Sequence, residues 1–309
     1  MRGYCGTYTN KKSEGIYSFD FDEDSGILSN SKLFTKIKSP KSVCYDNGYL
    51  FSVFENEEGA GICVIDDDGN IIDSIISEKA VSCFICTKDD LVFTANYHDG
   101  SFSVYSFQKK QLKLIFRDII KPLAGCHHVQ LIEDLILVPC LKLDQIHVYD
   151  NKFNKVDIIS VKKNSGPRNG IYLKDEKRLL MLMELSDSIV SFDYINNKFV
   201  YNKEYSLLLD NDKPSQSAAL KMTSNGLLLA SIRKRNIVSV IKDDVVVQNK
   251  KLDSDHPRDI LISSNDKFVI VASRDSDMLV SYEIVNERIK NKVSEIVVNE
   301  AISICLKGD

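Results

Sequence analysis

One pattern recurs along the whole chain: a short apolar segment, a turn, a longer apolar segment, a polar bend, and a segment in which apolar and polar residues alternate. It is clearest over Ala80–Phe107, Gly166–Tyr194 and His256–Ile284. The alternating segment is expected to be the third strand of each unit, and it begins near Ile16, Ile62, Phe102, Ile146, Ile189, Ile237 and Leu279. Neighbouring units are 40 residues (Ile62 to Phe102) to 48 residues (Ile189 to Ile237) apart. This period of about 40–50 residues, repeated seven times, is typical of β-propeller blades.

The two ends of the chain complete the count of strands. Ala301–Leu306 has the pattern of a first strand with no second strand after it, and Gly3–Tyr8 has the pattern of a second strand with no first strand before it. Together they would make one blade and close the ring without leaving an exposed strand edge. We therefore predict an all-β fold: one seven-bladed β-propeller domain over residues 1–309, with four-stranded antiparallel blades. Propellers of the WD type are a poor match, because a chain without Trp cannot contain the WD dipeptide.

Composition narrows the classes of partner. The formal net charge of -4 gives no basic footprint, so we expect no nucleic-acid partner. No apolar run approaches the ~18 residues of a membrane span, and Met1–Asn10 has no apolar secretory core, so we expect a cytoplasmic protein without a membrane partner. We expect a monomer or a weak homodimer.

The eight cysteines are scattered and lie mostly in apolar strand-like runs, which indicates reduced, buried thiols. Cys83 and Cys86 form a C-x-x-C, but no second pair accompanies them. We therefore expect no metal site and no cofactor.

The propeller topology itself selects candidate site residues. In an antiparallel pair, the start of the first strand lies beside the end of the second, so these two places in every blade converge on one rim of the central channel. The first-strand starts offer Lys41, His127, His128, Arg168, Gln216 and Arg258; the second-strand ends offer Glu55, Asn96, Lys142, Glu184, Arg233 and Arg274. A rim so rich in Arg and Lys suits an anionic small molecule, because guanidinium forks grip phosphate and carboxylate groups. His127 and His128 are adjacent, so we expect one to face the channel and the other a neighbouring blade.

Four stretches of the sequence resemble a known family. They are Gly125-Cys126-His127 with Val138–Ile146 (VPCLKLDQI); Gly166-Pro167-Arg168 with Glu184-Leu185; Ser217-Ala218-Ala219 with Arg233; and Pro257-Arg258. Along nearly the whole chain, the sequence resembles the seven-bladed lactonases of the 6-phosphogluconolactonase type, to which fungal carboxymuconate lactonizing enzymes are related. The GTYT of Gly6–Thr9 is similar to that family as well.

The resemblance implies a hydrolase that opens 6-phosphogluconolactone, a small anionic sugar lactone, in the pentose phosphate pathway. It makes His127 and Glu184 the acid/base candidates, with either assignment of the two roles allowed. It also implies that Arg168 and Arg233 bind the anionic groups of the substrate. Lys142, Arg258, Arg274 and Asn96 are the expected substrate-binding residues. Asn169, Met183 and Ile232 depart from the family pattern beside these positions, and these departures concern the substrate rather than the fold.

Two other functions stay open at this point. One is a reaction on a different anionic lactone or carboxylate, such as a cycloisomerisation. The other is a propeller without catalytic activity that binds a ligand or a protein.

Overall fold

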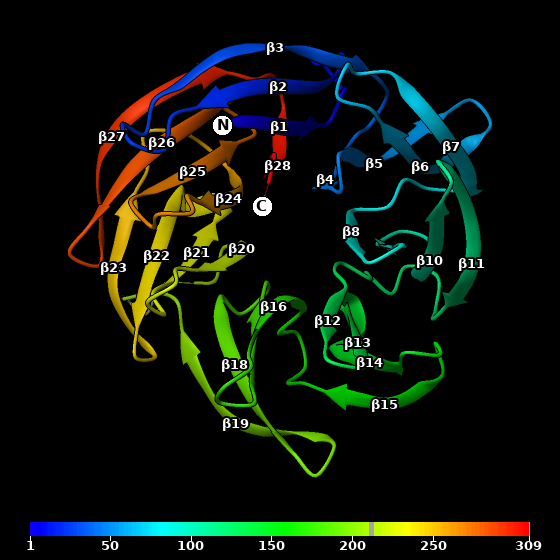
Figure 1. Ribbon diagram of the computed structural model, residues 1–309. Coiled ribbons are helices and arrows are strands. Elements are labelled where there is room, and N and C mark those ends of the chain that lie inside the picture. Colours follow the sequence, from blue (N-terminus) through cyan, green and yellow to red (C-terminus); the bar gives the residue numbers. More distant parts are fainter. Residues whose placement is uncertain (210–212, 309) are drawn as a thin grey trace.

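The computed structural model, which describes residues 1–209 and 213–308, consists of seven four-stranded antiparallel sheets arranged as the blades of a ring (Figure 1). The predicted fold is confirmed. We number the blades in chain order, starting with the one that contains the N-terminal strand.

The strands of the first four blades are as follows. Blade 1 consists of β28 (Ala301–Leu306), β1 (Arg2–Thr7), β2 (Gly15–Phe21) and β3 (Leu28–Lys36). Blade 2 consists of β4 (Val43–Asp46), β5 (Tyr49–Asn56), β6 (Gly59–Ile65) and β7 (Ile71–Glu78). Blade 3 consists of β8 (Phe84–Lys88), β9 (Leu91–Asn96), β10 (Ser101–Gln108) and β11 (Gln111–Ile119). Blade 4 consists of β12 (Gln130–Ile132), β13 (Leu135–Cys140), β14 (Gln145–Asp150) and β15 (Lys155–Ser160).

The remaining three blades follow the same order. Blade 5 consists of β16 (Pro167–Leu173), β17 (Arg178–Met183), β18 (Ser188–Ile195) and β19 (Lys198–Ser206). Blade 6 consists of β20 (Ser217–Met222), β21 (Leu228–Ile232), β22 (Ile237–Lys242) and β23 (Val245–Lys251). Blade 7 consists of β24 (Pro257–Ile262), β25 (Phe268–Ser273), β26 (Met278–Val285) and β27 (Arg288–Val297). Two short 3₁₀ turns, η1 (Leu141–Leu143) and η2 (Arg233–Arg235), follow the second strands of blades 4 and 6.

The predicted positions of the third strands are confirmed in all seven blades. Each observed third strand begins within three residues of its predicted start: β22 begins at the predicted Ile237, and the largest difference is in β6, which begins at Gly59 rather than Ile62.

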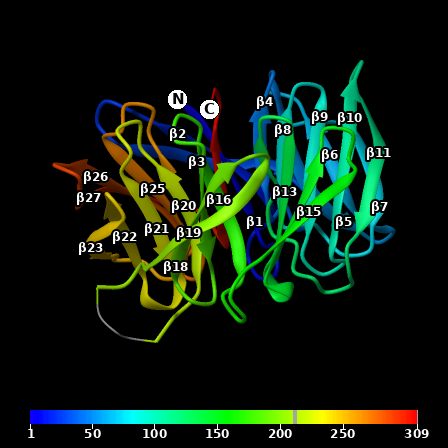
Figure 2. The same cartoon turned by 90° about the horizontal axis from the view of Figure 1, so that it is seen from below.

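Ring closure also occurs as predicted. β28 pairs antiparallel with β1, with Gly3 opposite Leu306 and Tyr4 opposite Cys305. The two chain ends consequently lie near each other on one face of the ring (Figure 2). Because the blade is shared between the ends, no inner strand is left unpaired where the ring meets.

The core lies between neighbouring blades. Five of the six residues of β17 are buried, because its sheet is covered on both faces, whereas the outer strand β19 has only exposed and half-buried residues. The apolar cluster around Phe93, Phe102, Val138 and Tyr149 joins strands of blades 3 and 4 in this way. Within the residues that the structure covers, no helix is long and apolar enough to cross a membrane.

Aspartate side chains hold the loops that connect one blade to the first strand of the next. Asp144 accepts hydrogen bonds from the backbone N–H groups of Asn164 (2.7 Å) and Gly166 (2.9 Å). Asp187 does the same for Ser215 (2.5 Å) and Ser217 (2.6 Å). The Asp144 carboxylate thus holds the turn that begins the first strand of blade 5, immediately before Arg168.

Candidate active site

A central channel runs between the first strands of the seven blades. It has a cavity volume of about 690 Å³. Each of these strands contributes to its wall, through residues that include Val43, Ile85, Gln130, Gly170, Leu220, Leu261 and Ile304. We call the end of the channel where first strands start and second strands end the channel mouth.

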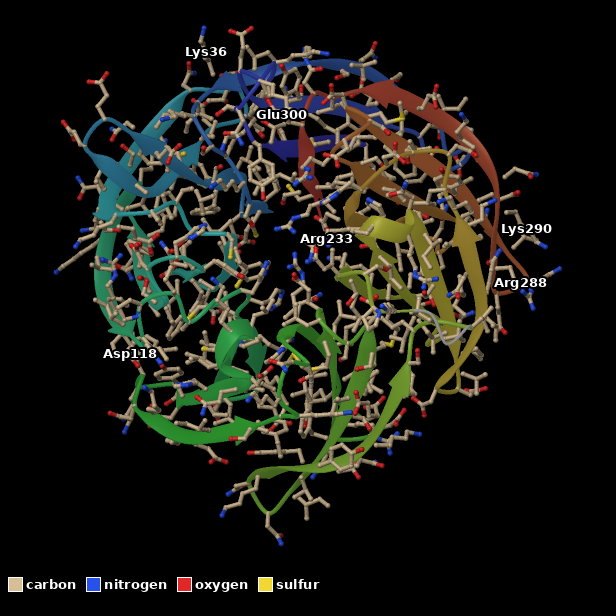
Figure 3. All side chains as sticks on the ribbon, turned by 180° about the vertical axis from the view of Figure 1, so that it is seen from behind. Lys36, Asp118, Arg233, Arg288, Lys290 and Glu300 are labelled. Carbon is tan, nitrogen blue, oxygen red and sulfur yellow. The ribbon has the colours of Figure 1, made fainter. Side chains whose placement is uncertain are left out.

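The predicted convergence at this mouth is confirmed by the strand register. In blade 5, Pro167 lies opposite Met183, and in blade 7, Pro257 lies opposite Ser273. The next residues along the chain, which are Arg168, Glu184, Arg258 and Arg274, are therefore at the same rim. In the view along the ring axis, Arg233 lies near the centre of the ring, whereas Lys290 and Arg288 lie at its outer edge (Figure 3).

Glu184 is the centre of a buried ion cluster. Its Oε2 pairs with Nη1 of Arg168, and its Oε1 lies 2.5 Å from Nη2 of Arg233. The three side chains are between 7% and 10% exposed, so the carboxylate is largely removed from water and is compensated by two guanidinium groups.

Backbone carbonyls of blade 6 hold both arginines in place. Arg168 donates from Nε to the carbonyl of Ala218 (2.6 Å), and Arg233 donates from Nε to the carbonyl of Gln216 (3.0 Å). Each guanidinium is therefore fixed on one side by the propeller frame and on the other by Glu184.

His127 is in contact with the same cluster. Nη1 of Arg168 lies 2.6 Å from Nε2 of His127. Because a guanidinium only donates, Nε2 accepts this hydrogen bond, and the imidazole is neutral with its proton on Nδ1. Burial, together with the positive charges of Arg168, Arg258 and Arg233, lowers the pKa of His127 well below its usual value.

Burial and the neighbouring charges also shift the pKa values of Glu184 and Arg168. Burial alone would raise the pKa of Glu184, but Arg168, Arg233 and Arg258 outweigh it, so this pKa lies below its usual value. Burial lowers the pKa of Arg168 to about 10. At neutral pH the cluster thus contains an ionised carboxylate, charged guanidinium groups and a neutral imidazole.

The two histidines contact different blades, but the expectation that only one of them faces the channel is wrong. His127 contacts Arg168 of blade 5, whereas the ring of His128 lies on Phe84 of blade 3 with centroids 3.8 Å apart. Both nevertheless border the channel, because the regular part of the strand begins only at Gln130.

The predicted substrate-binding residues differ in where the structure places them. Arg258 borders the channel cavity. Lys142 is exposed on η1, with its Nζ 5.0 Å from the centre of the Tyr97 ring. Arg274 donates from Nε to Asp275 (2.7 Å), so a carboxylate next to it in sequence already compensates its charge.

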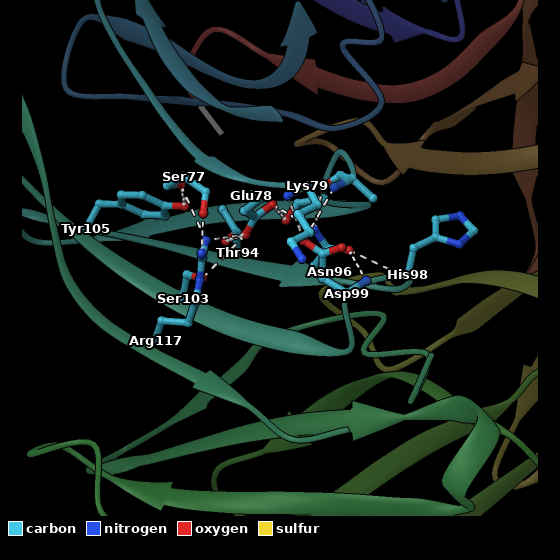
Figure 4. A network of polar contacts seen from close by, with 12 residues as sticks. Ser77, Glu78, Lys79, Thr94, Asn96, His98, Asp99, Ser103, Tyr105 and Arg117 are labelled. Carbon is cyan, nitrogen blue, oxygen red and sulfur yellow. Dashed lines mark hydrogen bonds and ion pairs between the residues drawn. The ribbon is translucent and has the colours of Figure 1, made fainter. Parts of the chain in front are cut away.

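Asn96 does not reach the mouth, contrary to the sequence-based expectation. It is fully buried, and its amide nitrogen donates to Glu78 (2.8 Å) and to the carbonyl of Ala80 (2.5 Å) (Figure 4). Its amide oxygen accepts from the backbone of His98 and Asp99. The Asn96 side chain stays inside the blade because it donates to the buried carboxylate of Glu78, which also pairs with Arg117. Asn96 is therefore assigned to the frame of the propeller.

Two tyrosines at the mouth were not singled out in the sequence. Tyr8 lines the cavity, and Tyr97 lies 5.9 Å from the His127 ring, measured between centroids. A signal existed for both: Tyr8 belongs to the GTYT stretch, and Tyr97 directly follows a second strand. Among residues 1–209 and 213–308, no group of three or more His, Cys, Asp or Glu side chains is placed to hold a metal ion.

Comparison with known proteins gives one family over almost the full length. The family described as "Lactonase, 7-bladed beta-propeller" matches residues 2–306. An uncharacterized protein of Lactococcus lactis subsp. cremoris is 27% identical, with 89% of each chain covered. The 6-phosphogluconolactonase of Bacillus subtilis is 23% identical over 99% of this chain and 97% of its own length. A crystal structure of a Lactobacillus plantarum protein has the same fold, with a TM-score of 0.90, 22% identity and 98% of both chains covered. The match across residues 2–306 shows that the chain belongs to the seven-bladed β-propeller lactonase family.

Proposed function

We propose that this lactonase opens 6-phospho-D-glucono-1,5-lactone to 6-phosphogluconate at the channel mouth. The observation that carries the proposal is that one guanidinium, that of Arg168, contacts both the Glu184 carboxylate and the His127 imidazole. The similarity to the Bacillus subtilis 6-phosphogluconolactonase supports the choice of substrate.

Lactone hydrolysis needs a polarised carbonyl, an activated water and a protonated leaving oxygen. In this proposal the lactone carbonyl oxygen accepts from N–H groups of Arg168 and Arg233. These groups are preorganised, because Glu184 and two backbone carbonyls hold them before the substrate arrives. Such fixed donors stabilise the oxyanion that develops on the carbonyl in the transition state.

His127 serves as the base. When the substrate carbonyl takes over the Arg168 N–H, Nε2 of the neutral imidazole becomes free to accept a proton from water. The hydroxide attacks the carbonyl carbon, and the tetrahedral intermediate collapses with cleavage of the bond to the ring oxygen. The imidazolium then returns its proton to that leaving oxygen, and the carboxylic acid product loses its own proton to solvent.

Glu184 has an electrostatic role in this scheme. Its pKa is held below the usual value and both of its oxygens are engaged by guanidinium groups, so it is a poor proton acceptor. Its charge orients Arg168 and Arg233 and balances part of the positive charge around His127. No step of the reaction calls for a metal or a cofactor.

The test is acid release from freshly prepared 6-phosphogluconolactone in weak buffer, corrected for spontaneous hydrolysis. We expect acceleration in proportion to the protein concentration. Absence of acceleration by a protein whose circular dichroism and unfolding transition show a folded state would refute the proposed function.

A further inference from the structure

Charge compensation is uneven around the channel mouth. On blades 5 and 6, Glu184 neutralises part of the charge of Arg168 and Arg233. On blades 7 and 2, Arg258 and Lys41 also line the cavity. Across the described part of the chain, neither of these two side chains forms an ion pair or a hydrogen bond, although the charge of Arg258 helps to lower the pKa of Glu184. The nearby carboxylate of Glu55 is engaged by Lys38, at 3.4 Å, and by the hydroxyl of Ser39, at 2.8 Å.

The side of the mouth formed by blades 7, 1 and 2 is organised around Tyr8. Nζ of Lys41 lies 5.6 Å from the centre of the Tyr8 ring, and Cζ of Arg274 lies 5.9 Å from it. The face of an aromatic ring attracts cations, so Tyr8 gathers two of them at the rim. The segment is tied down as well, since the hydroxyl of Thr9 accepts from the backbone N–H of Ser39, two residues before Lys41.

We propose that Tyr8, Lys41 and Arg258 form the subsite for the anionic group of the substrate, with Lys41 across the mouth from the reacting carbonyl and Arg258 on blade 7, between Arg233 of blade 6 and Tyr8 of blade 1. The assignment rests on the proposed function for its choice of phosphate as that group. In a seven-bladed ring, blades 7, 1 and 2 face blades 4 and 5, where His127 and Glu184 lie (Figure 1). A lactone whose carbonyl contacts Arg168 therefore extends its phosphate toward Lys41 and Arg258. Within the described residues, the N–H groups of these two side chains make no hydrogen bond to the protein and can bind the phosphate.

This placement excludes the other lysine–tyrosine pair of the mouth. Lys142 and Tyr97 mirror Lys41 and Tyr8 in arrangement, but they lie on blades 4 and 3, beside His127. Lys142 does not line the cavity, whereas Lys41 does. The two lysines thus offer a matched comparison within the same protein.

The kinetic test uses two substrates that differ only in the phosphate, 6-phosphogluconolactone and glucono-1,5-lactone. Lys41→Gln is expected to lower kcat/KM for the phosphorylated lactone on the order of 10- to 100-fold and to change it less than about threefold for the other. Lys290→Gln, on the outer strand β27 (Figure 3), should change neither. If Lys142→Gln produces the selective loss and Lys41→Gln does not, the subsite is on the other side and the proposal is wrong.

A binding test separates the subsite from catalysis. Titration calorimetry with 6-phosphogluconate and with gluconate needs no turnover. We expect wild type to bind the phosphorylated acid more tightly and Lys41→Gln and Tyr8→Leu to remove that preference. If the protein does not hydrolyse lactones but shows this pattern, the proposed function fails while the anion subsite stands. Equal binding of the two acids, or a preference that survives in Lys41→Gln, would overturn the subsite.

Discussion

Nη1 of Arg168 lies 2.6 Å from Nε2 of His127, so a positive group, and not a carboxylate, faces the imidazole at the channel mouth. A carboxylate in that place would favour the protonated ring, whereas the guanidinium favours the neutral one. The group that we propose as the base is therefore an uncharged imidazole, near the positive charges of Arg168, Arg233 and Arg258.

The first prediction concerns the protonation of His127 and His128. Burial is the main cause that lowers both pKa values, that of His128 to about 3. Between about pH 8 and 5, NMR signals of the two rings should not titrate in the folded protein, while both should titrate near ~6.5 in urea. A His127 signal that titrates near its usual value in the folded state would contradict the neutral base.

The same pKa values set the direction of a stability change. The folded pKa values lie below those of the unfolded chain, so below about pH 6.5 the unfolded state takes up protons that the folded state refuses. The contribution of these residues is complete above that pH, and the free energy of unfolding falls by up to about 1.4 kcal/mol per pH unit per ring as the pH decreases toward the folded values. Urea unfolding of wild type and of His128→Gln between pH 7.5 and 5.5 should show a smaller dependence in the variant.

Binding of an anion should change the protonation of His127. Arg258 is among the charges that lower the pKa of His127, and an anion beside Arg258 offsets this charge. We expect 6-phosphogluconate to raise the pKa of His127 and gluconate to raise it less. The NMR titration that locates the ring signal measures this directly, and an unchanged or lowered value would contradict the electrostatic coupling.

Removing the carboxylate of the cluster should destabilise the fold. Glu184→Gln leaves Arg168 and Arg233 buried without their counter-charge, which should lower the free energy of unfolding by about 3–5 kcal/mol. Glu14→Gln removes an exposed ion pair with Lys36 on the outside of the ring and should leave the unfolding transition unchanged. Equal urea midpoints for the two variants would show that the cluster is not a buried ion network in solution.

Arg168 should not tolerate replacement by lysine. A single ammonium cannot reach Ala218, Glu184 and His127 in the directions that the planar guanidinium serves. We expect Arg168→Lys to reduce kcat on the order of 100-fold or more, the scale of losing an oxyanion donor, in a folded protein. Arg178→Lys, whose side chain pairs with Glu176 and Asp193 at the surface of the same blade, is the matched control and should retain wild-type activity.

We expect the aspartates that bind the loops between blades to stabilise the fold and to have no role in the reaction. Asp187 is fully buried, and its carboxylate receives the backbone N–H groups of Ser215 and Ser217. Asp187→Ala leaves these donors without a partner, at a cost of roughly 1–3 kcal/mol for each group that stays buried. Urea unfolding measures the loss; the exposed Asp175→Ala serves as the control and should behave as wild type.

The fold was predictable because it repeats. Strand alternation and a constant period determine where each third strand begins, and the incomplete units at Gly3–Tyr8 and Ala301–Leu306 predict how the ring closes. The mouth followed from antiparallel register alone, since that register places the start of β16, which contains Arg168, beside the end of β17, which Glu184 follows.

The details of the site depend on contacts between blades, which the sequence does not display. Asn96 pairs with the first residue of its third strand, as Met183 does in blade 5, so it lies one position before the counterpart of Glu184, and its side chain binds Glu78 of the preceding blade. His127 has a usual pKa near neutrality, and only the ring brings arginines of blades 5, 6 and 7 around it. Tyr8 carries no charge, so its role in gathering Lys41 and Arg274 appears only once the ring is closed.

The most direct test of the lactonase mechanism is acid release from 6-phosphogluconolactone by wild type and by His127→Ala, at equal concentrations of protein shown to be folded. The account predicts strong acceleration by wild type and a rate for the variant reduced by at least about 100-fold, the scale of losing a general base. An unchanged rate in His127→Ala would remove the imidazole from the reaction and contradict the mechanism.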